Sequence, residues 1–201
     1  MLKGTVLVLA LPVIIIFLMV WNKKTRPSKF RLLGGIALAV YVLLLLDVTL
    51  FPLPVQSEVL RDRRLYGSPP NNLIPLKGLI GMMEHQSSAV LIRQIVGNIL
   101  LFLPLGYLVP AIWKVRGVHR LAFIAFSVSL LIEGAQFLIS QAIGYTYRIF
   151  DVDDLILNTL GGIIGYVIYA AFVPVIRAFE MDVVQHAKPS DGRSASSSAN
   201  P

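Results

Sequence analysis

Five stretches of the chain are apolar and long enough to cross a hydrocarbon core of about 30 Å. They lie at residues 4–21, 30–51, 94–113, 121–143 and 155–176. Because a backbone surrounded by lipid must satisfy its own hydrogen bonds, each stretch is expected to form a helix. The composition agrees, since 56% of the residues are hydrophobic and only 14% are charged. The sequence therefore predicts an all-α integral membrane bundle of five transmembrane helices.

The charges between these stretches predict the direction of each crossing. Lys3 precedes the first stretch, but the residues after it, 19–23, lack the small side chains of a signal-peptide cleavage site, so we expect this helix to be retained. The connection at residues 22–31 is rich in lysine and arginine, which the positive-inside rule assigns to the cytoplasm. We therefore predict a multi-pass protein with its N-terminus outside the cell and its C-terminus in the cytoplasm.

The same pattern divides the chain into three segments. Residues 1–29 hold the first transmembrane helix and the cytoplasmic basic connection, and residues 30–177 form the main membrane domain. Residues 178–201 end in a serine-rich, low-complexity sequence and are expected to be a disordered cytoplasmic tail.

Charge and cysteine content exclude several kinds of site. The formal charge of +7 comes from short basic clusters between apolar stretches, without interleaved aromatic residues, so no nucleic-acid partner is expected. The chain has no cysteine, and any metal site must therefore use oxygen or imidazole ligands. The motifs of soluble nucleotide-binding proteins and hydrolases, such as the P-loop, HExxH and GxSxG, are also missing.

The long outer loop at residues 52–93 has two notable features. The sequence LIPLKGLIGMMEH at residues 73–85 is apolar but too short to span a bilayer, and it carries charged residues. It predicts a short helix at the outer membrane interface. For the RDRR sequence at residues 61–64, a solvated loop is favoured over contact with an anionic headgroup.

Polar side chains gather on one face of each predicted helix when residues are placed about 100° apart. The aligned residues are Ser129, Glu133, Gln136 and Ser140 in the fourth stretch and Asp151, Asp154, Asn158, Gly161 and Gly165 around the start of the fifth, with Gln94, Asn98 and Asp47 on the other helices. Glu133 lies near the middle of the bilayer, where an ionised carboxylate costs about 3 kcal/mol, so it is expected to face the bundle interior. These faces predict a polar pocket that opens outward.

Each of these features also has a purely structural interpretation. The aspartates of residues 151–154 suit the N-terminus of a helix, with Arg148 as a salt-bridge partner. Gly161 and Gly165 favour close packing of helices over ligand access. Glu133 and the glutamine one turn after it would also form a buried structural hydrogen bond.

Four sequence motifs, in order and at consistent spacing, resemble the VanZ-like family of bacterial membrane proteins. They are NLIP at 72–75, GNILLFLPLGYLVP at 97–110, IEGAQ at 132–136 and RIFDVDDLILNTLGGIIGY at 148–166, and the likeness extends over about residues 41–169. The resemblance gives weight to Asn72, Pro75, Arg93, Asn98, Pro104, Gly106, Glu133, Gln136, Arg148, Asp151, Asp154, Asn158, Gly161 and Gly165. Leu76 stands where the family more often has an aromatic residue.

The resemblance also implies a place of action. The founding member of the family is associated with resistance to the glycopeptide teicoplanin, which implies a role at the outer face of a bacterial plasma membrane. We therefore expect a non-catalytic envelope protein whose pocket binds a membrane lipid or a lipid-linked cell-wall precursor. The residues expected to bind this ligand are Asn72, Arg93, Asn98, Gln136 and Asn158.

An integral-membrane enzyme that acts on an envelope lipid is the alternative. In that case Glu133 acts as acid or base, Asp151 and Asp154 hold a divalent cation, and Arg148 or Arg93 holds a phosphate. A proton-coupled transporter is disfavoured, because the chain has one deep carboxylate and no internal repeat. The identity of the ligand and the oligomeric state do not follow from the sequence.

Overall fold

The computed structural model describes residues 28–53, 70–113 and 115–186, with side chains as far as residue 173, and isolated positions between residues 12 and 24. The RDRR sequence and the serine-rich tail lie outside the described residues, as does most of the predicted first transmembrane helix. The second to fifth predicted helices are therefore the ones that the structure tests.

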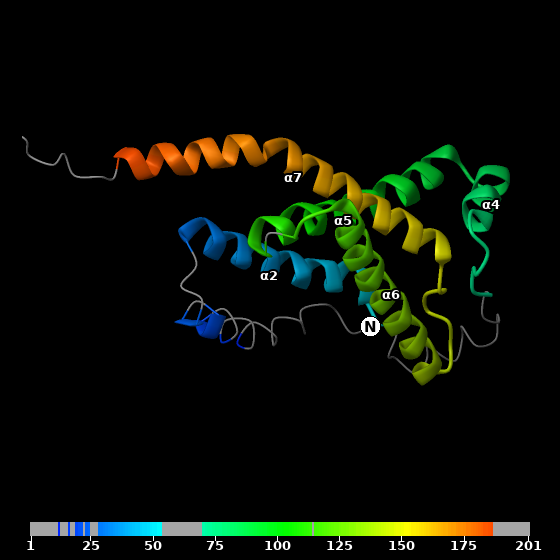
Figure 1. Cartoon of the computed structure of the whole chain (residues 1–201). Coiled ribbons are helices and arrows are strands. Elements are labelled where there is room, and N and C mark those ends of the chain that lie inside the picture. Colours follow the sequence, from blue (N-terminus) through cyan, green and yellow to red (C-terminus); the bar gives the residue numbers. More distant parts are fainter. Residues whose placement is uncertain are drawn as a thin grey trace, which may run out of the picture. The chain divides into compact units, whose positions relative to one another are not determined.

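The regular elements of the described residues are helices (Figure 1). They are α2 (Lys29–Leu50), α4 (Lys77–His85), α5 (Ser88–Trp113), α6 (Val118–Ile143) and α7 (Val152–His186). The short helix α4 lies within the segment at 73–85 for which an interfacial helix is predicted. Its existence is confirmed, whereas its position at a membrane surface stays a prediction.

Among the described residues, four helical segments are long and apolar enough to cross a membrane. They are Arg31–Leu50, Ser88–Trp113, Val118–Ile143 and Val152–Val173. The structure thus confirms the second to fifth predicted spans. Helix α5 begins six residues before its predicted start at residue 94, and the polar residues in this added part, Ser88 and Arg93, lie exposed.

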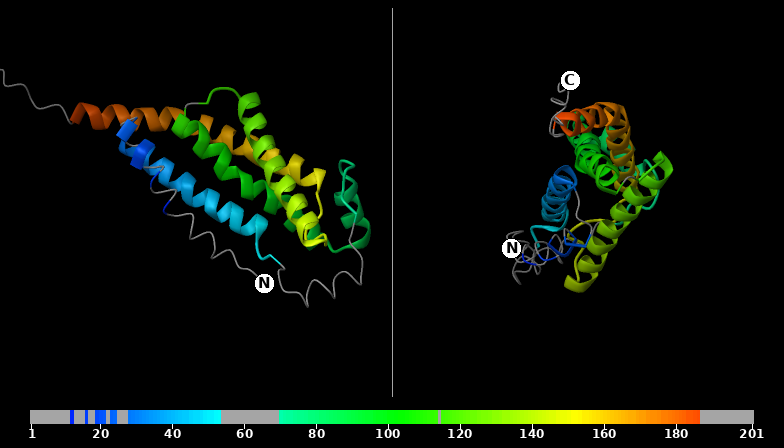
Figure 2. Two further views of the ribbon diagram at one scale, coloured as in Figure 1. Left: turned by 90° about the horizontal axis from the view of Figure 1, so that it is seen from below. Right: turned by 60° about the vertical axis from the view of Figure 1, so that its left-hand side comes forward.

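Helices α2 and α5 lie side by side, and α6 crosses them (Figure 2). At one end Arg31 of α2 donates from Nε and Nη2 to the carbonyl of Ile112, at 3.1 and 2.8 Å. Further along, the Tyr41 hydroxyl donates to the carbonyl of Leu101 at 2.9 Å, close to Pro104 inside α5. A proline inside a helix leaves backbone acceptors available, and polar groups from neighbouring helices commonly occupy such acceptors within membranes.

Glycines bring α7 against α5 at backbone distance. A Cβ added at Gly161 would overlap the carbonyl oxygen of Ile99, and one at Gly165 would overlap that of Leu103. Gly106 of α5 in turn faces the carbonyl oxygen of Gly162. The structure therefore confirms close packing as the role of the Gly161 and Gly165 pair. Helix pairs in membranes gain dispersion energy from such contacts because lipid provides no hydrophobic drive between helices.

The apolar core lies between α2, α5 and α6. Its buried side chains are Leu45, Phe102, Leu105, Val109, Leu121, Ala125 and Ile132. This compact unit extends to Tyr169, and a second unit from Ala170 contains the continuation of α7 to His186. The candidate site described next belongs wholly to the first unit.

Candidate functional site

Most polar side chains singled out in the sequence meet where α2 and α6 end and α5 and α7 begin. This region is called the polar end here. Its four buried or half-buried carboxylates, Glu133, Asp151, Asp153 and Asp154, are called the carboxylate cluster. They are near enough to one another to interact electrostatically.

The polar face predicted for α6 is buried in the structure. Ser129, Glu133, Gln136 and Ser140 are all at most 5% exposed. Glu133 lies ten residues before the end of α6 at Ile143, which is about 15 Å at 1.5 Å per residue. The Oε2 atom of Glu133 nevertheless accepts the backbone N–H of Asp151 at 3.0 Å. The chain after α6 therefore folds back along the helix and carries a backbone donor to the deep carboxylate.

Asp151 caps its own helix and also holds the outer loop. Its Oδ1 accepts the backbone N–H of Asp153 at 2.9 Å, which satisfies a free donor in the first turn of α7. The same oxygen accepts the Asn72 side-chain amide at 2.7 Å. Asn72 and Asp151 also form a parallel β-bridge, in which the Asn72 N–H donates to Phe150 and the Val152 N–H donates to Asn72. The predicted capping role is thus correct for Asp151, but it is one of two roles.

Asp153 caps a different helix, α4. Its carboxylate accepts the backbone N–H groups of Leu76 and Leu79 at the start of α4, and also the Asn72 amide at 3.1 Å. The residue before α4, Leu76, is left-handed with φ of 64° and offers no side-chain cap, so the cap comes from α7 instead. Asp153 is 1% exposed. Residues 72–79 are therefore held onto the polar end by buried carboxylates.

Gly78 allows this approach. A Cβ at Gly78 would lie 2.8 Å from Asn72 Nδ2 and 2.9 Å from Asp153 Oδ2. By contrast, a Cβ at Gly81, three residues later, would meet nothing within 4 Å. The first turn of α4 therefore presses its backbone against the carboxylates, and the second does not.

Asp154 connects α7 to α5. Its Oδ1 accepts the side-chain amides of Gln94 and Asn98, each at 2.6 Å. One turn further along α7, Asn158 is 4% exposed and donates to the Ser129 hydroxyl at 2.9 Å. The Oδ1 atom of Asn158 is buried without a hydrogen-bond partner among the described residues. The predicted polar face of α7 therefore faces both α5 and α6.

Arg148 and Gln136 hold the end of α2. Arg148 Nη2 donates to the carbonyls of Val48 and Phe51, at 3.1 and 3.5 Å. Gln136 Nε2 donates to the carbonyl of Thr49 at 2.8 Å. The prediction that Arg148 forms a salt bridge with the capping aspartates is not met among the described contacts, because its guanidinium binds the free carbonyls of a helix C-terminus.

Two predicted site residues lie apart from this network. Arg93 is exposed on α5, and Asp47 is half-buried on α2. Within the described residues, neither side chain makes a hydrogen bond or an ion pair with the carboxylate cluster. The structure thus brings Asn72, Asn98, Gln136 and Asn158 together with the carboxylates and leaves Arg93 at the surface.

Burial also changes the protonation of groups at the membrane boundary. It raises the pKa of the Asp151 carboxyl above its ordinary value, although the hydrogen bonds from the Asp153 N–H and from Asn72 lower the pKa in part. Burial likewise raises the pKa of Tyr147, whose hydroxyl is buried without a hydrogen-bond partner among the described residues. Burial therefore favours the neutral forms of Asp151 and Tyr147.

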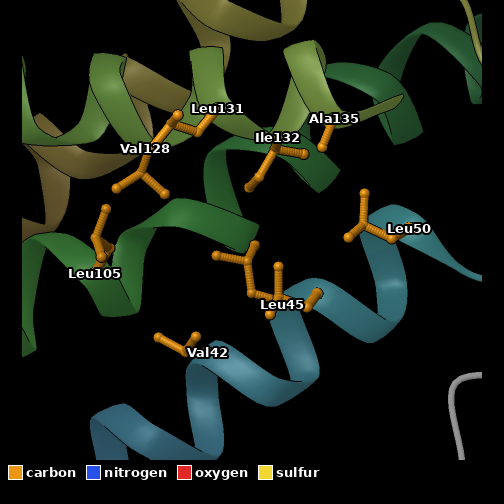
Figure 3. A pocket seen from close by; sticks show the side chains of 9 residues that line it. Val42, Leu45, Leu50, Leu105, Val128, Leu131, Ile132 and Ala135 are labelled. Carbon is orange, nitrogen blue, oxygen red and sulfur yellow. The ribbon is translucent and has the colours of Figure 1, made fainter. Parts of the chain in front are cut away.

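Beside the polar end lies an apolar cavity of about 270 Å³ between α2, α5 and α6 (Figure 3). Its lining includes Leu45, Leu50, Leu105, Val128, Ile132 and Ala135. The predicted polar side chains do not line this cavity, since they are engaged with one another behind it. The cavity differs in chemistry from the polar pocket that the sequence predicts.

The carboxylates do not converge as metal ligands do. Asp151 binds Asn72 while Asp154 binds Gln94 and Asn98. Within the described residues, no group of three or more histidine, aspartate or glutamate side chains has the arrangement of a metal site. The predicted divalent cation at Asp151 and Asp154 is therefore not supported by the geometry.

Sequence reasoning missed two contributors to this site. It noted Asp153 as a cap but not as a ligand of the outer loop, and it did not single out Gly78. Helical periodicity within α7 predicts neither contact, because both contacts are made with α4, a separate helix. A glycine near the start of a short amphipathic helix was the only available signal.

One comparison with known proteins identifies the family of the chain. The VanZ/LLP1 family model matches residues 38–173, more than half of the 201-residue chain. The match includes Ser88–Trp113, Val118–Ile143 and Val152–Val173 completely and Arg31–Leu50 from residue 38 on, together with residues 72–79 and the whole carboxylate cluster. Neither the curated proteins nor the solved structures provide a match. With its apolar helices and this family match, the chain belongs to the VanZ/LLP1 family of multi-pass membrane proteins.

Proposed function

We propose that this protein acts at the outer face of a bacterial plasma membrane, where its polar end binds a lipid or a lipid-linked cell-wall precursor. Bound there, it reduces the action of glycopeptide antibiotics that anchor themselves in the membrane, as teicoplanin does. Membership of the VanZ/LLP1 family supports the link to glycopeptide resistance. The protein has no catalytic step in this proposal.

The observation that carries the proposal is the way in which the outer loop is held. Buried carboxylates at the start of α7 bind the segment from Asn72 to Leu79, yet apolar side chains of this segment and of the rest of α4 stay exposed. The exposed fractions are 65% for Leu73, 57% for Ile74, 52% for Leu76, 51% for Ile80 and 68% for Met83. An apolar surface of this kind, fixed at the end of a membrane bundle, suits the headgroup and acyl boundary of a bilayer.

An enzyme acting on an envelope lipid is the second candidate, and one observation favours it. Glu133 and Asp151 are 3% and 5% exposed and lie beside each other, joined by a hydrogen bond from the Asp151 N–H. Paired carboxylates in different environments are a common acid–base arrangement. Lipid turnover by the purified protein, lost in Glu133→Gln, would favour this candidate over a binding protein.

The proposal is tested by neutralising the carboxylates without changing their shape. In Glu133→Gln, Asp151→Asn and Asp154→Asn, an amide oxygen still accepts the bonds from the Asp151 N–H, from Asn72 and from the α5 amides. We expect each variant to reach the wild-type membrane level and to melt at or above the wild-type temperature. We also expect each to lose teicoplanin tolerance when expressed in a susceptible Gram-positive host, while vancomycin tolerance changes less.

Glu84→Gln is the matched control, because Glu84 is an exposed carboxylate on α4 outside the cluster. It should keep full tolerance. If the three cluster variants are stable and also keep tolerance, the carboxylate cluster is structural only and the proposed site is wrong. Equal protection against teicoplanin and vancomycin would contradict the role at the lipid surface.

A further inference from the structure

We infer that the apolar cavity between α2, α5 and α6 binds one hydrocarbon chain of an anionic membrane lipid, whose phosphate lies at Arg148. The inference rests on the proposed function, since it takes the protein to bind lipid, and it adds which part of the lipid is bound where. It is carried by the lining of the cavity, its size and its position next to the polar end.

The lining of the cavity is entirely aliphatic. Side chains from α2, α5 and α6 surround it, among them Leu45, Leu105, Val128 and Ile132 (Figure 3). Water gains few hydrogen bonds in such a space, and cavities lined by aliphatic carbon stay dry or take up apolar ligands. A hydrocarbon occupant restores the dispersion contacts that the lining atoms otherwise lack.

The size of the cavity selects the kind of occupant. A helix with its side chains is about 10–12 Å across, and even a short piece of one needs far more room than about 270 Å³. The lining residues on α2 extend from Val42 to Leu50, which is roughly 12 Å at 1.5 Å per residue. A narrow space of this length is suited to a single unbranched chain.

One side of the cavity faces away from the protein. Val42 is 36% exposed on α2 and Leu131 is 73% exposed on α6, although both belong to the lining. Both lie on segments that are apolar enough to cross a membrane. A chain of the surrounding bilayer can therefore enter from the side, without passing through the protein.

One end of the cavity lies next to the last carbonyl groups of α2, which accept hydrogen bonds from Gln136 and Arg148. Leu50 and Ala135 of the lining are neighbours in sequence of Thr49 and Gln136, which are hydrogen-bonded to each other. Arg148 binds the carbonyls of Val48 and Phe51 at this position and is exposed. A guanidinium binds phosphate strongly, so a lipid whose chain fills the cavity would place its phosphate at Arg148.

The test measures lipid binding directly. The purified, delipidated full chain in detergent is titrated with phosphatidylglycerol or with phosphatidylcholine, and bound lipid is counted by native mass spectrometry. The wild type should retain one phosphatidylglycerol in preference to phosphatidylcholine. Ala135→Phe fills the cavity and should weaken this binding at least tenfold, whereas Ala142→Phe, the same change at an exposed position of α6, should leave it unchanged.

Arg148→Gln distinguishes binding of the lipid phosphate from binding of the hydrocarbon chain. It should remove the preference for phosphatidylglycerol while binding of a chain in the cavity continues. Leu46→Phe fills the cavity from α2 and guards against unfolding of Ala135→Phe, and melting temperatures are measured for all variants. Wild-type binding in folded Ala135→Phe and Leu46→Phe, or equal loss in Ala142→Phe, would overturn the inference.

The outcome is distinct from that of the proposed function. If cavity-filling variants lose the lipid but keep teicoplanin tolerance, the lipid site exists and the proposed function fails. If tolerance depends on the carboxylate cluster while lipid binding is unchanged in the cavity-filling variants, the proposed function stands and this inference fails.

Discussion

At the scale of single residues, each aspartate after residue 150 has its own partner. Asp151 caps α7 and binds Asn72, Asp153 caps α4, and Asp154 binds Gln94 and Asn98. Three carboxylates within four residues thus connect α7 to the outer loop and to α5. A single capping residue could not make all of these connections.

The raised pKa of Asp151 predicts how stability depends on pH. The ordinary pKa of an aspartate is 3.8, and burial raises that of Asp151 in the folded protein. The folded state therefore binds the proton of Asp151 more tightly than the unfolded state does. As pH rises from the ordinary pKa through the pKa of the folded state, ionisation of Asp151 lowers the free energy of unfolding. Asp151→Asn lacks the titration, so its melting temperature relative to wild type should rise over that window.

Thermal unfolding in detergent at a series of pH values checks this prediction. Glu84→Gln, at an exposed carboxylate, serves as the control and should follow the wild type. A difference between Asp151→Asn and wild type that stays constant with pH would show that the carboxylate has the same pKa in both states.

At the scale of elements, α4 depends on one glycine. Gly78→Ala places a methyl group against the side-chain ends of Asn72 and Asp153, so either these side chains or the first turn of α4 must shift and the bonds between them weaken. Overpacking of this kind costs about 1–3 kcal/mol. We expect amide exchange at Leu76 and Leu79 to be about tenfold faster or more in Gly78→Ala, because their acceptor is Asp153.

Gly81→Ala is the control in the same helix, since its methyl group meets nothing within 4 Å. Hydrogen exchange followed by mass spectrometry reports on both variants in the full-length chain. Unchanged exchange in Gly78→Ala would contradict the close contact between α4 and the start of α7.

The contact between α5 and α7 predicts a similar contrast. A methyl group at Gly165 would overlap the Leu103 carbonyl, so Gly165→Ala should lower stability by about 1–3 kcal/mol. Gly134 on α6 has open space, and Gly134→Ala should be neutral or stabilise by about 0.5–1 kcal/mol through helix propensity. Melting followed by circular dichroism measures both, and equal effects would mean that α5 and α7 are not at backbone distance.

At the scale of the whole molecule, the open question is which membrane face carries the polar end. The basic residues Lys29, Arg31, Arg116 and Arg120 lie at the opposite ends of the helices, which favours an outward polar end. Because the chain has no cysteine, single cysteines report without background. Gln86→Cys should react with an impermeant maleimide in intact cells, and Arg116→Cys should react only after permeabilisation.

Both positions are exposed in connections between helices, so their accessibility is matched. The opposite labelling pattern would place the carboxylate cluster at the cytoplasmic face. The proposed contact with cell-wall precursors outside the cell would then be wrong, whereas the packing described for the helices would be unaffected.

The class of protein and the inward faces of its helices follow from the sequence alone. Apolar length predicts the four observed spans because lipid forces a backbone to bond internally. The 3.6-residue period predicts that Ser129, Glu133, Gln136 and Ser140 are buried together, since a polar face must turn away from lipid. The family motifs predict the same residues at the polar end.

The hydrogen-bond partners of the side chains on these faces follow from the tertiary structure and not from the sequence pattern. Glu133 was expected to need a partner at mid-membrane, and the partner is the Asp151 N–H, brought there because the chain folds back along α6. Arg148 binds carbonyls of α2, and Asp153 caps α4, although both are remote in sequence from these partners. Periodicity gives the direction of a side chain within one helix, but the partner depends on how helices are placed in space. For the same reason, the apolar cavity beside the polar end has no counterpart in any local sequence pattern.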